Sequence, residues 1–139
     1  MPGRPTLRGA NAEGSVVAIM ARSPARPTAV KTRLAGAIPN TRARVDLYTA
    51  FIADQMRVCR SLSNITLRMA YTPEGSAKDF EPMGLSPEEL VLQRGHDLAT
   101  RERALFEDLF EEGFRRVVII GSDLPSLPGR ILEDAIRRL

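Results

Sequence analysis

The sequence is poor in residue types on which several common kinds of protein depend. Among 139 residues it has one cysteine, Cys59, one histidine, His96, and no tryptophan. A single cysteine excludes a framework of disulfide bonds and a zinc site built from cysteines. A single histidine excludes the usual metal sites that use several histidines. Disulfide-rich proteins and zinc proteins of the common types are therefore removed from consideration.

Long apolar runs are also missing. No stretch approaches the roughly 18 apolar residues that a membrane-spanning helix needs. Residues 1–14 contain no apolar segment of the kind found in secretory signals. They are rich in Gly, Pro, Arg and Ala without periodicity, which predicts a disordered leader. We expect no membrane partner and a cytoplasmic location.

The charge is unevenly distributed along the chain. The net charge is +3, yet residues 1–44 carry eight basic side chains and one acidic one, whereas residues 45–139 carry twelve basic and sixteen acidic ones. An acidic body with a basic first part is not typical of a nucleic-acid-binding protein. It favours a local site for a small anion. The length fits one domain, which we place at residues 15–139.

Apolar segments alternate along the chain with segments of helical periodicity. The pattern predicts strands at 15–20, 64–71, 90–92 and 116–121, helices at 42–62, 98–112 and 129–139, and a loop at 72–87. Apolar strands without alternation, separated by helices, are typical of an α/β fold with a Rossmann-like parallel sheet and helices on both faces. The sequence therefore predicts a doubly wound sheet.

The two longer helices carry apolar stripes that predict their buried faces. The first stripe consists of Val45, Tyr48, Ile52, Met56, Cys59 and Leu62, at steps of three and four residues. In the second helix we expect Leu98, Leu105, Leu109 and Phe106 to face inward. On its stripe, Cys59 is interpreted as a core residue.

Ligands of open parallel sheets bind beyond the carboxyl ends of the strands, where the strand order reverses. In the usual order the first strand lies beside the fourth. The loops after Met20 and after Gly121 are then expected to meet at this place. Functional residues should be sought in these two loops first.

The loop after the first strand contains Arg22, Arg26, Lys31 and Arg33. Arg offers a bidentate fork to phosphate and Lys a compact charge, so the loop is a candidate phosphate site. Lys31-Thr32 resembles the end of a P-loop, but Val30 stands where that motif needs glycine, which argues against a P-loop NTPase. A solvated basic loop is the alternative interpretation.

Two further polar clusters are candidates for the same site. Asp123 follows the last strand, where a carboxylate could hold a divalent cation that bridges to phosphate; the alternative is a turn residue or helix cap. The segment from Gln93 to Leu98 precedes the second helix, and Asp97 is a natural N-cap for it. Arg101 lies one turn later and is expected to reach a phosphate or to pair with a carboxylate.

Three motifs occur in an order that resembles a known family. They are VVAIMARSP with VKTRLAG, then LQRGHDLATR, then VVIIGSDLPSLP. The chain is similar to the DUF2064 family, also called radical-SAM/selenodomain-associated transferases, which are glycosyltransferase-A-like. The resemblance implies a nucleotide-diphospho-sugar transferase fold and Mg²⁺ or Mn²⁺ as cofactor. It also implies site roles: phosphate contacts for Lys31 and Arg33, cation binding for Asp123, and a nucleotide pocket shaped by Gln93, Gly95, Asp97 and Arg101.

The resemblance suggests an enzyme that transfers a glycosyl or nucleotidyl group from a nucleotide or nucleotide sugar to an acceptor. Family members continue past the Gly-Ser-Asp-Leu-Pro loop, so we expect the N-terminal part of the fold, shortened at the C-terminus, with no identifiable catalytic base. The alternatives are a non-catalytic nucleotide-binding module and a protein-interaction domain. An unprotected sheet edge would also favour a homodimer.

Overall fold

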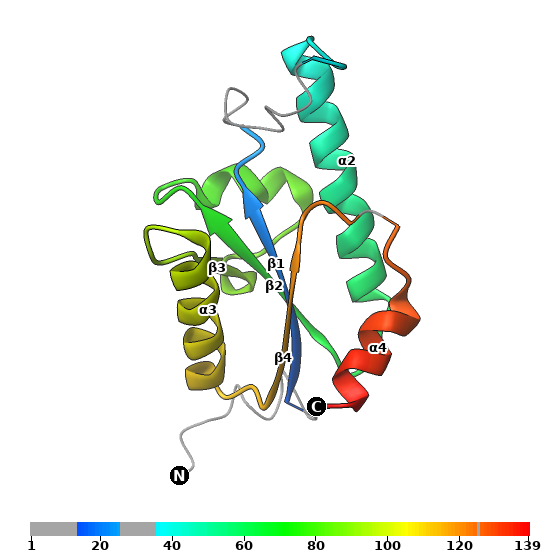
Figure 1. Ribbon diagram of the computed structural model, residues 1–139, viewed down its shortest axis with the longest axis vertical. Helices are drawn as coiled ribbons and strands as arrows, with labels where there is room; N and C mark the ends of the chain where they lie inside the picture. Colours follow the sequence, from blue (N-terminus) through cyan, green and yellow to red (C-terminus); the bar gives the residue numbers. More distant parts are fainter. Residues whose placement is uncertain (1–13, 26–35, 125) are drawn as a thin grey trace.

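The computed structural model describes residues 14–25, 36–124 and 126–139. Lys31 and Arg33 therefore lie outside the described residues, as does most of the predicted leader. The elements follow one another in the order shown in Figure 1: β1 (Ser15–Arg22), α2 (Thr41–Arg60), β2 (Thr66–Thr72), η3 (Ala77–Met83), η4 (Pro87–Glu89), β3 (Leu90–Leu92), α3 (Leu98–Glu112), β4 (Arg116–Gly121) and α4 (Gly129–Arg137).

Four strands of the described chain form one parallel sheet in the order β3-β2-β1-β4. In its register, Val17 of β1 lies opposite Leu67 of β2 and Val118 of β4. The predicted parallel sheet is confirmed, as is the position of the first strand beside the fourth. The strand order reverses between β1 and β4, and both strands end at the same edge of the sheet (Figure 1).

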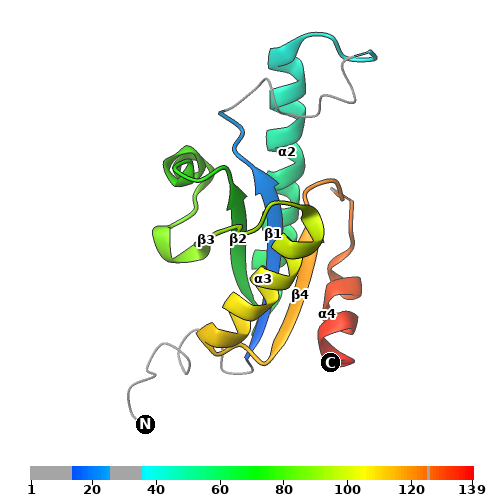
Figure 2. The same ribbon diagram turned by 60° about the vertical axis from the view of Figure 1, so that its left-hand side comes forward.

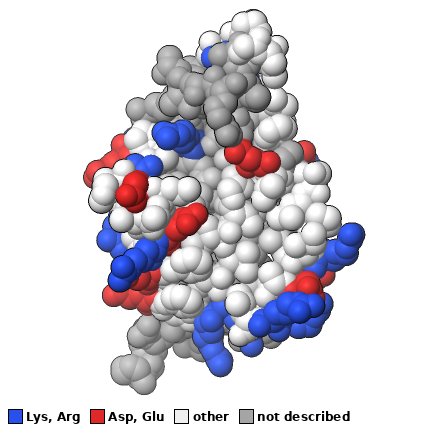
Figure 3. All heavy atoms as spheres, in the orientation of Figure 1, with Lys and Arg blue, Asp and Glu red and all other residues white. Residues whose placement is uncertain are grey.

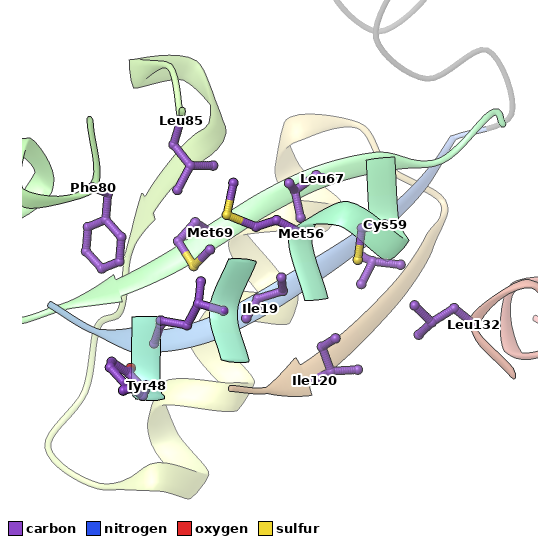
Figure 4. Packing of buried hydrophobic residues seen from close by; sticks show 13 residues of the cluster. Ile19, Tyr48, Met56, Cys59, Leu67, Met69, Phe80, Leu85, Ile120 and Leu132 are labelled. Atoms are coloured by element: carbon purple, nitrogen blue, oxygen red, sulfur yellow. The ribbon is translucent and has the colours of Figure 1, made fainter. Parts of the chain in front are cut away.

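Helices cover both faces of the sheet, as predicted. Figure 2 shows α3 in front of β1 and β4, α2 behind the sheet and α4 beside β4. The face covered by α2 and α4 carries the larger core, in which Ile19, Ile52 and Met69 are fully or almost fully buried (Figure 4). The α3 face carries the smaller core, with Val16, Leu105 and Leu109.

Local sequence signals determine where the helices begin and end. The Asn40 side chain accepts from the Ala43 N–H and caps α2, and the Asp97 side chain accepts from the Thr100 N–H and caps α3. Gly113 ends α3 in the left-handed region, at φ 116°, which glycine adopts without steric cost. The sequence therefore encodes both ends of α3.

The structure corrects three details of the sequence prediction. Leu98 is 64% exposed, because it is the first residue of α3 and lies before the turns that cover the sheet. Phe106, 36% exposed, stacks on Phe110 instead of entering the core. The predicted loop 72–87 contains the 3₁₀ helix η3 and leads into a second one, η4, and its Phe80 and Leu85 complete the larger core.

No helix in the described ranges is long and apolar enough to cross a membrane. Within those ranges β4 lies at one edge of the sheet, with β1 as its partner strand. Its central residues Val118 and Ile119 are half-buried.

Candidate functional site

A cavity of about 760 Å³ opens where the sequence predicts a ligand site, at the carboxyl ends of β1 and β4. One wall comes from α2 and the two strand ends, and the opposite wall comes from the start of α3 and the segment before it. The lining residues are Met20, Ala21, Arg22, Tyr48, Thr72, Gln93, His96, Asp97, Leu98, Arg101, Glu102, Ile119, Ile120, Gly121, Ser122 and Asp123.

The structure brings the predicted site residues together. Arg22, Gln93, Asp97, Arg101 and Asp123 line this one cavity, although they come from segments far apart in the sequence. Gly95 lies in the same wall and accepts a hydrogen bond from Arg101 through its carbonyl. The predicted phosphate contacts of Lys31 and Arg33 stay predictions, because these residues lie outside the described ranges.

Tyr48 lies between the end of β1 and the start of the loop after β4, although its place on the apolar stripe predicts only a core role. Its hydroxyl accepts from the Arg22 N–H at 2.7 Å and donates to the Arg22 carbonyl at 3.0 Å. The Ser122 hydroxyl donates to the Tyr48 hydroxyl oxygen at 3.5 Å. Burial raises the pKa of Tyr48, so its hydroxyl stays protonated and can donate. A tyrosine on an apolar stripe gave no sequence signal of this role.

Gln55 holds the end of β4 from the same helix. It is 2% exposed, and its Nε2 donates to the Gly121 carbonyl at 2.7 Å. Its Oε1 is buried and has no hydrogen-bond partner in the described part of the chain. A buried glutamine on an otherwise apolar stripe is the one sequence signal that could have pointed to this contact.

The turn that follows β1 is anchored by Ser23, which is fully buried. Its N–H donates to the Thr72 carbonyl at 2.8 Å, and its hydroxyl donates to Asp79 Oδ2 at 2.6 Å. The Ala25 N–H in turn donates to that hydroxyl at 3.1 Å. The turn at Ser23 is therefore fixed to β2 and η3 by hydrogen bonds.

The wall that precedes α3 is held by its own polar groups. The Gln93 backbone N–H donates to the Tyr71 carbonyl at 2.9 Å, which continues the pairing of β3 with β2, and its side-chain amide donates to the Ala70 carbonyl at 2.8 Å. Gly95 has φ 126°, and a Cβ there would lie 2.6 Å from Thr100 Oγ1, so any other residue would be strained at this position. Arg101 Nε donates to the Gly95 carbonyl at 2.9 Å, which leaves the rest of its half-buried guanidinium at the cavity.

Asp97 is confirmed as the N-cap of α3. Hydrogen bonds from the Thr100 N–H and hydroxyl to its carboxylate lower the pKa of Asp97 below the usual value. His96 Nε2 lies 3.5 Å from Asp97 Oδ2, and its side chain is exposed. Asp97 Oδ1 already accepts the hydrogen bonds of the cap, so Asp97 Oδ2 is the oxygen that has more capacity to accept from a ligand.

The charges around the cavity are mixed. Its described lining includes the carboxylates of Asp97, Glu102 and Asp123 and the guanidinium groups of Arg22 and Arg101. Three negative groups against two positive ones would not hold a diphosphate without further positive charge. A bound cation is one source of that charge.

The described residues contain no cluster of three or more His, Cys, Asp or Glu side chains that could hold a metal ion alone. Asp123 is exposed at the end of β4. Mg²⁺ is commonly held by one or two carboxylates together with substrate phosphates. Among the described residues, the donor set therefore fits a cation that binds together with a phosphorylated ligand better than a metal held by side chains alone.

The surface beside this cavity also differs in charge from one element to the next. In the face that Figure 3 shows, the surface over β4 is largely uncharged, and charged side chains gather over α3 and over α4.

A second, smaller cavity of about 310 Å³ lies at the opposite ends of the strands, where Ser15, Asn64, Arg116 and Arg137 are among its lining residues.

Three comparisons place the chain among known proteins. The family model described as "Uncharacterized protein conserved in bacteria (DUF2064)" matches residues 55–139, more than half of the chain. None of the curated proteins matches. A crystal structure titled "putative nucleotide-diphospho-sugar transferase", from Desulfovibrio desulfuricans G20, is similar, with 28% identity and a TM-score of 0.78. The match covers 89% of this chain and 53% of that one, so the chain spans about half of its neighbour's length.

Proposed function

The chain belongs to the DUF2064 family, and on this premise we propose that it binds the diphosphate of a nucleotide or nucleotide sugar in the cavity at the carboxyl ends of β1 and β4. The transferase-like fold is shared with a chain described as a nucleotide-diphospho-sugar transferase. The observation that carries the proposal is that Arg22, Arg101 and Asp123 surround one cavity at the point where the strand order reverses.

Within this proposal the basic side chains hold the phosphates. Arg22 and Arg101 approach from opposite walls of the cavity, and Lys31 and Arg33 follow the anchored turn after β1. Guanidinium groups bind phosphate through two parallel hydrogen bonds, and an ammonium group adds a compact charge. Together they would offset the carboxylates of the lining.

Asp123 would hold a divalent cation, Mg²⁺ or Mn²⁺, against the diphosphate. Such an ion neutralises negative charge that develops on a leaving phosphate group. The chain's own contribution is to place the carboxylate, since Gln55 and Tyr48 hold the residues just before it. The reaction supported best is transfer from a nucleotide sugar or nucleoside triphosphate, as a glycosyl or nucleotidyl transferase.

Calorimetric titration with UDP-sugars, CTP and GTP, each with Mg²⁺ or Mn²⁺, tests the proposal. We expect one of these ligands to bind, and Lys31→Ala to weaken its binding by about 10-fold or more through loss of a charged phosphate contact. Lys78→Ala is the matched control, because Lys78 is the other lysine and lies outside the cavity lining. If none of the nucleotides binds, the proposed function is wrong.

Turnover is measured separately from binding. Release of nucleoside diphosphate or pyrophosphate in the presence of candidate acceptors would establish an active transferase. Tight binding with no release under any acceptor would instead support the non-catalytic nucleotide-binding module.

A further inference from the structure

Tyr48 contacts the end of β1 and the start of the loop after β4, and it does so with one oxygen atom. Its hydroxyl bonds both backbone groups of Arg22, at 2.7 and 3.0 Å, and receives the Ser122 hydroxyl at 3.5 Å. Arg22 is the last residue of β1, and Ser122 directly precedes Asp123. The side chain is 4% exposed, so solvent cannot easily replace these bonds.

The same helix adds a second contact two turns later. Tyr48 and Gln55 are seven residues apart and therefore lie on one face of α2. Gln55 holds the Gly121 carbonyl at 2.7 Å, directly before Ser122. The distance between the end of β1 and the end of β4 is thus set by a rigid helix as well as by the sheet.

The position of this oxygen matters for the site as a whole. On the β1 side the chain continues into the basic segment, and on the β4 side it continues into the carboxylate of Asp123. A cation that bridges Asp123 to a phosphate requires a fixed spacing between the end of β1 and the loop after β4. The Tyr48 hydroxyl bonds Arg22 on one side and Ser122 on the other, so it is placed to maintain that spacing.

We propose that Tyr48 is a positioning residue that couples the end of β1 to the loop after β4, so that phosphate binding at Arg22 and cation binding at Asp123 reinforce each other. The proposal rests on the proposed function for its ligands. The coupling between the loops is a property of the protein without ligands and can be measured alone.

The test removes the hydroxyl and nothing else. Tyr48→Phe deletes the shared oxygen, and Tyr71→Phe is the matched control because it removes the only other tyrosine hydroxyl of the chain. Ile52→Val is a second control. Ile52 is fully buried on the same helix, and its side chain forms no hydrogen bond to Arg22 or Ser122. This variant measures how much weaker packing of α2 alone changes amide exchange at Arg22 and at residues 121–123.

Amide hydrogen exchange of the ligand-free protein is the first readout. In Tyr48→Phe we expect exchange at Arg22 and at residues 121–123 to rise together, by about 10-fold for a lost hydrogen bond. In both control variants, exchange at Arg22 and at residues 121–123 should change no more than the global stability of that variant does. A rise at Arg22 alone, with residues 121–123 unchanged, would overturn the proposal.

The second readout is the ratio of nucleotide affinity with Mn²⁺ to nucleotide affinity with chelator. A residue that only stabilises the fold would leave this ratio unchanged, whereas we expect it to fall at least about fivefold in Tyr48→Phe. An unchanged ratio in Tyr48→Phe would contradict the coupling. If the wild-type chain binds no nucleotide, the proposed function fails, and the exchange experiment alone decides the role of Tyr48.

Discussion

Replacing Asp123 by asparagine should change nucleotide affinity in opposite directions with and without a cation. The carboxylate attracts a divalent cation and repels a diphosphate. Asparagine keeps the size and removes the charge. With Mn²⁺ or Mg²⁺ present, Asp123→Asn should weaken nucleotide binding, and with chelator present it should strengthen it.

The magnitude follows from the exposure of the side chain. Asp123 is exposed, so the water-like limit of Coulomb's law applies, with about 1 kcal/mol for two unit charges 4 Å apart. A divalent cation doubles this value to about 2 kcal/mol, or about 30-fold in affinity. The repulsion of a more distant diphosphate is weaker and screened by salt, so without cation the variant should gain about two- to fivefold.

Isothermal titration calorimetry in parallel buffers, one with Mn²⁺ and one with EDTA, measures both effects. Glu107→Gln is the control, because it also removes one negative charge but lies on the exposed side of α3, where Glu107 pairs with Arg103. It should change both affinities slightly and in the same direction. If Asp123→Asn also shifts both affinities in one direction, the assignment of Asp123 to the cation is refuted.

Three further predictions concern stability. Leu105→Ala, in the smaller core at 1% exposure, should lower the free energy of unfolding in urea by about 2–5 kcal/mol, and a smaller loss would contradict the packing of α3 on the sheet. Asp97→Ala should lower the melting temperature at pH 7, and because hydrogen bonding lowers the pKa of Asp97, the difference from wild type should shrink as the pH falls below about 4. Burial raises the pKa of Cys59 to about 11, so the folded protein should react slowly with thiol reagents, and stability should fall as the pH rises from 9 towards 11, where only the unfolded thiol ionises.

The sequence predicted the fold well because its signals were local and strong. Four consecutive β-branched residues at 117–120 and the flanking glycine identified β4, and the cap residue Asp97 identified the start of α3. The errors concern long-range packing. Periodicity assigned Leu98 to the inner face, but the position of the helix end relative to the sheet decides its exposure.

The site was predicted through topology. The rule that ligands bind where the strand order reverses predicts that Arg22 and Asp123 lie at one site, and the motif before α3 adds Gln93, Asp97 and Arg101. Tyr48 and Gln55 were missed, because Tyr48 lies on an apolar helical stripe that predicts a core residue and Gln55 belongs to no motif. Their hydroxyl and amide groups act on the ends of β1 and β4, and no sequence pattern shows that these strand ends lie beside α2.

Nuclear magnetic resonance of the ¹⁵N-labelled chain, titrated with the UDP-sugar, CTP or GTP that binds in the presence of Mg²⁺, would locate the nucleotide on the protein. We expect chemical-shift changes at Arg22, at residues 93–101 and at residues 121–123, which surround the cavity at the carboxyl ends of the strands. Ser15, Asn64 and Arg137, around the smaller cavity at the opposite end, should stay unchanged. Changes confined to that opposite end, or none at saturating nucleotide, would contradict the proposed nucleotide site.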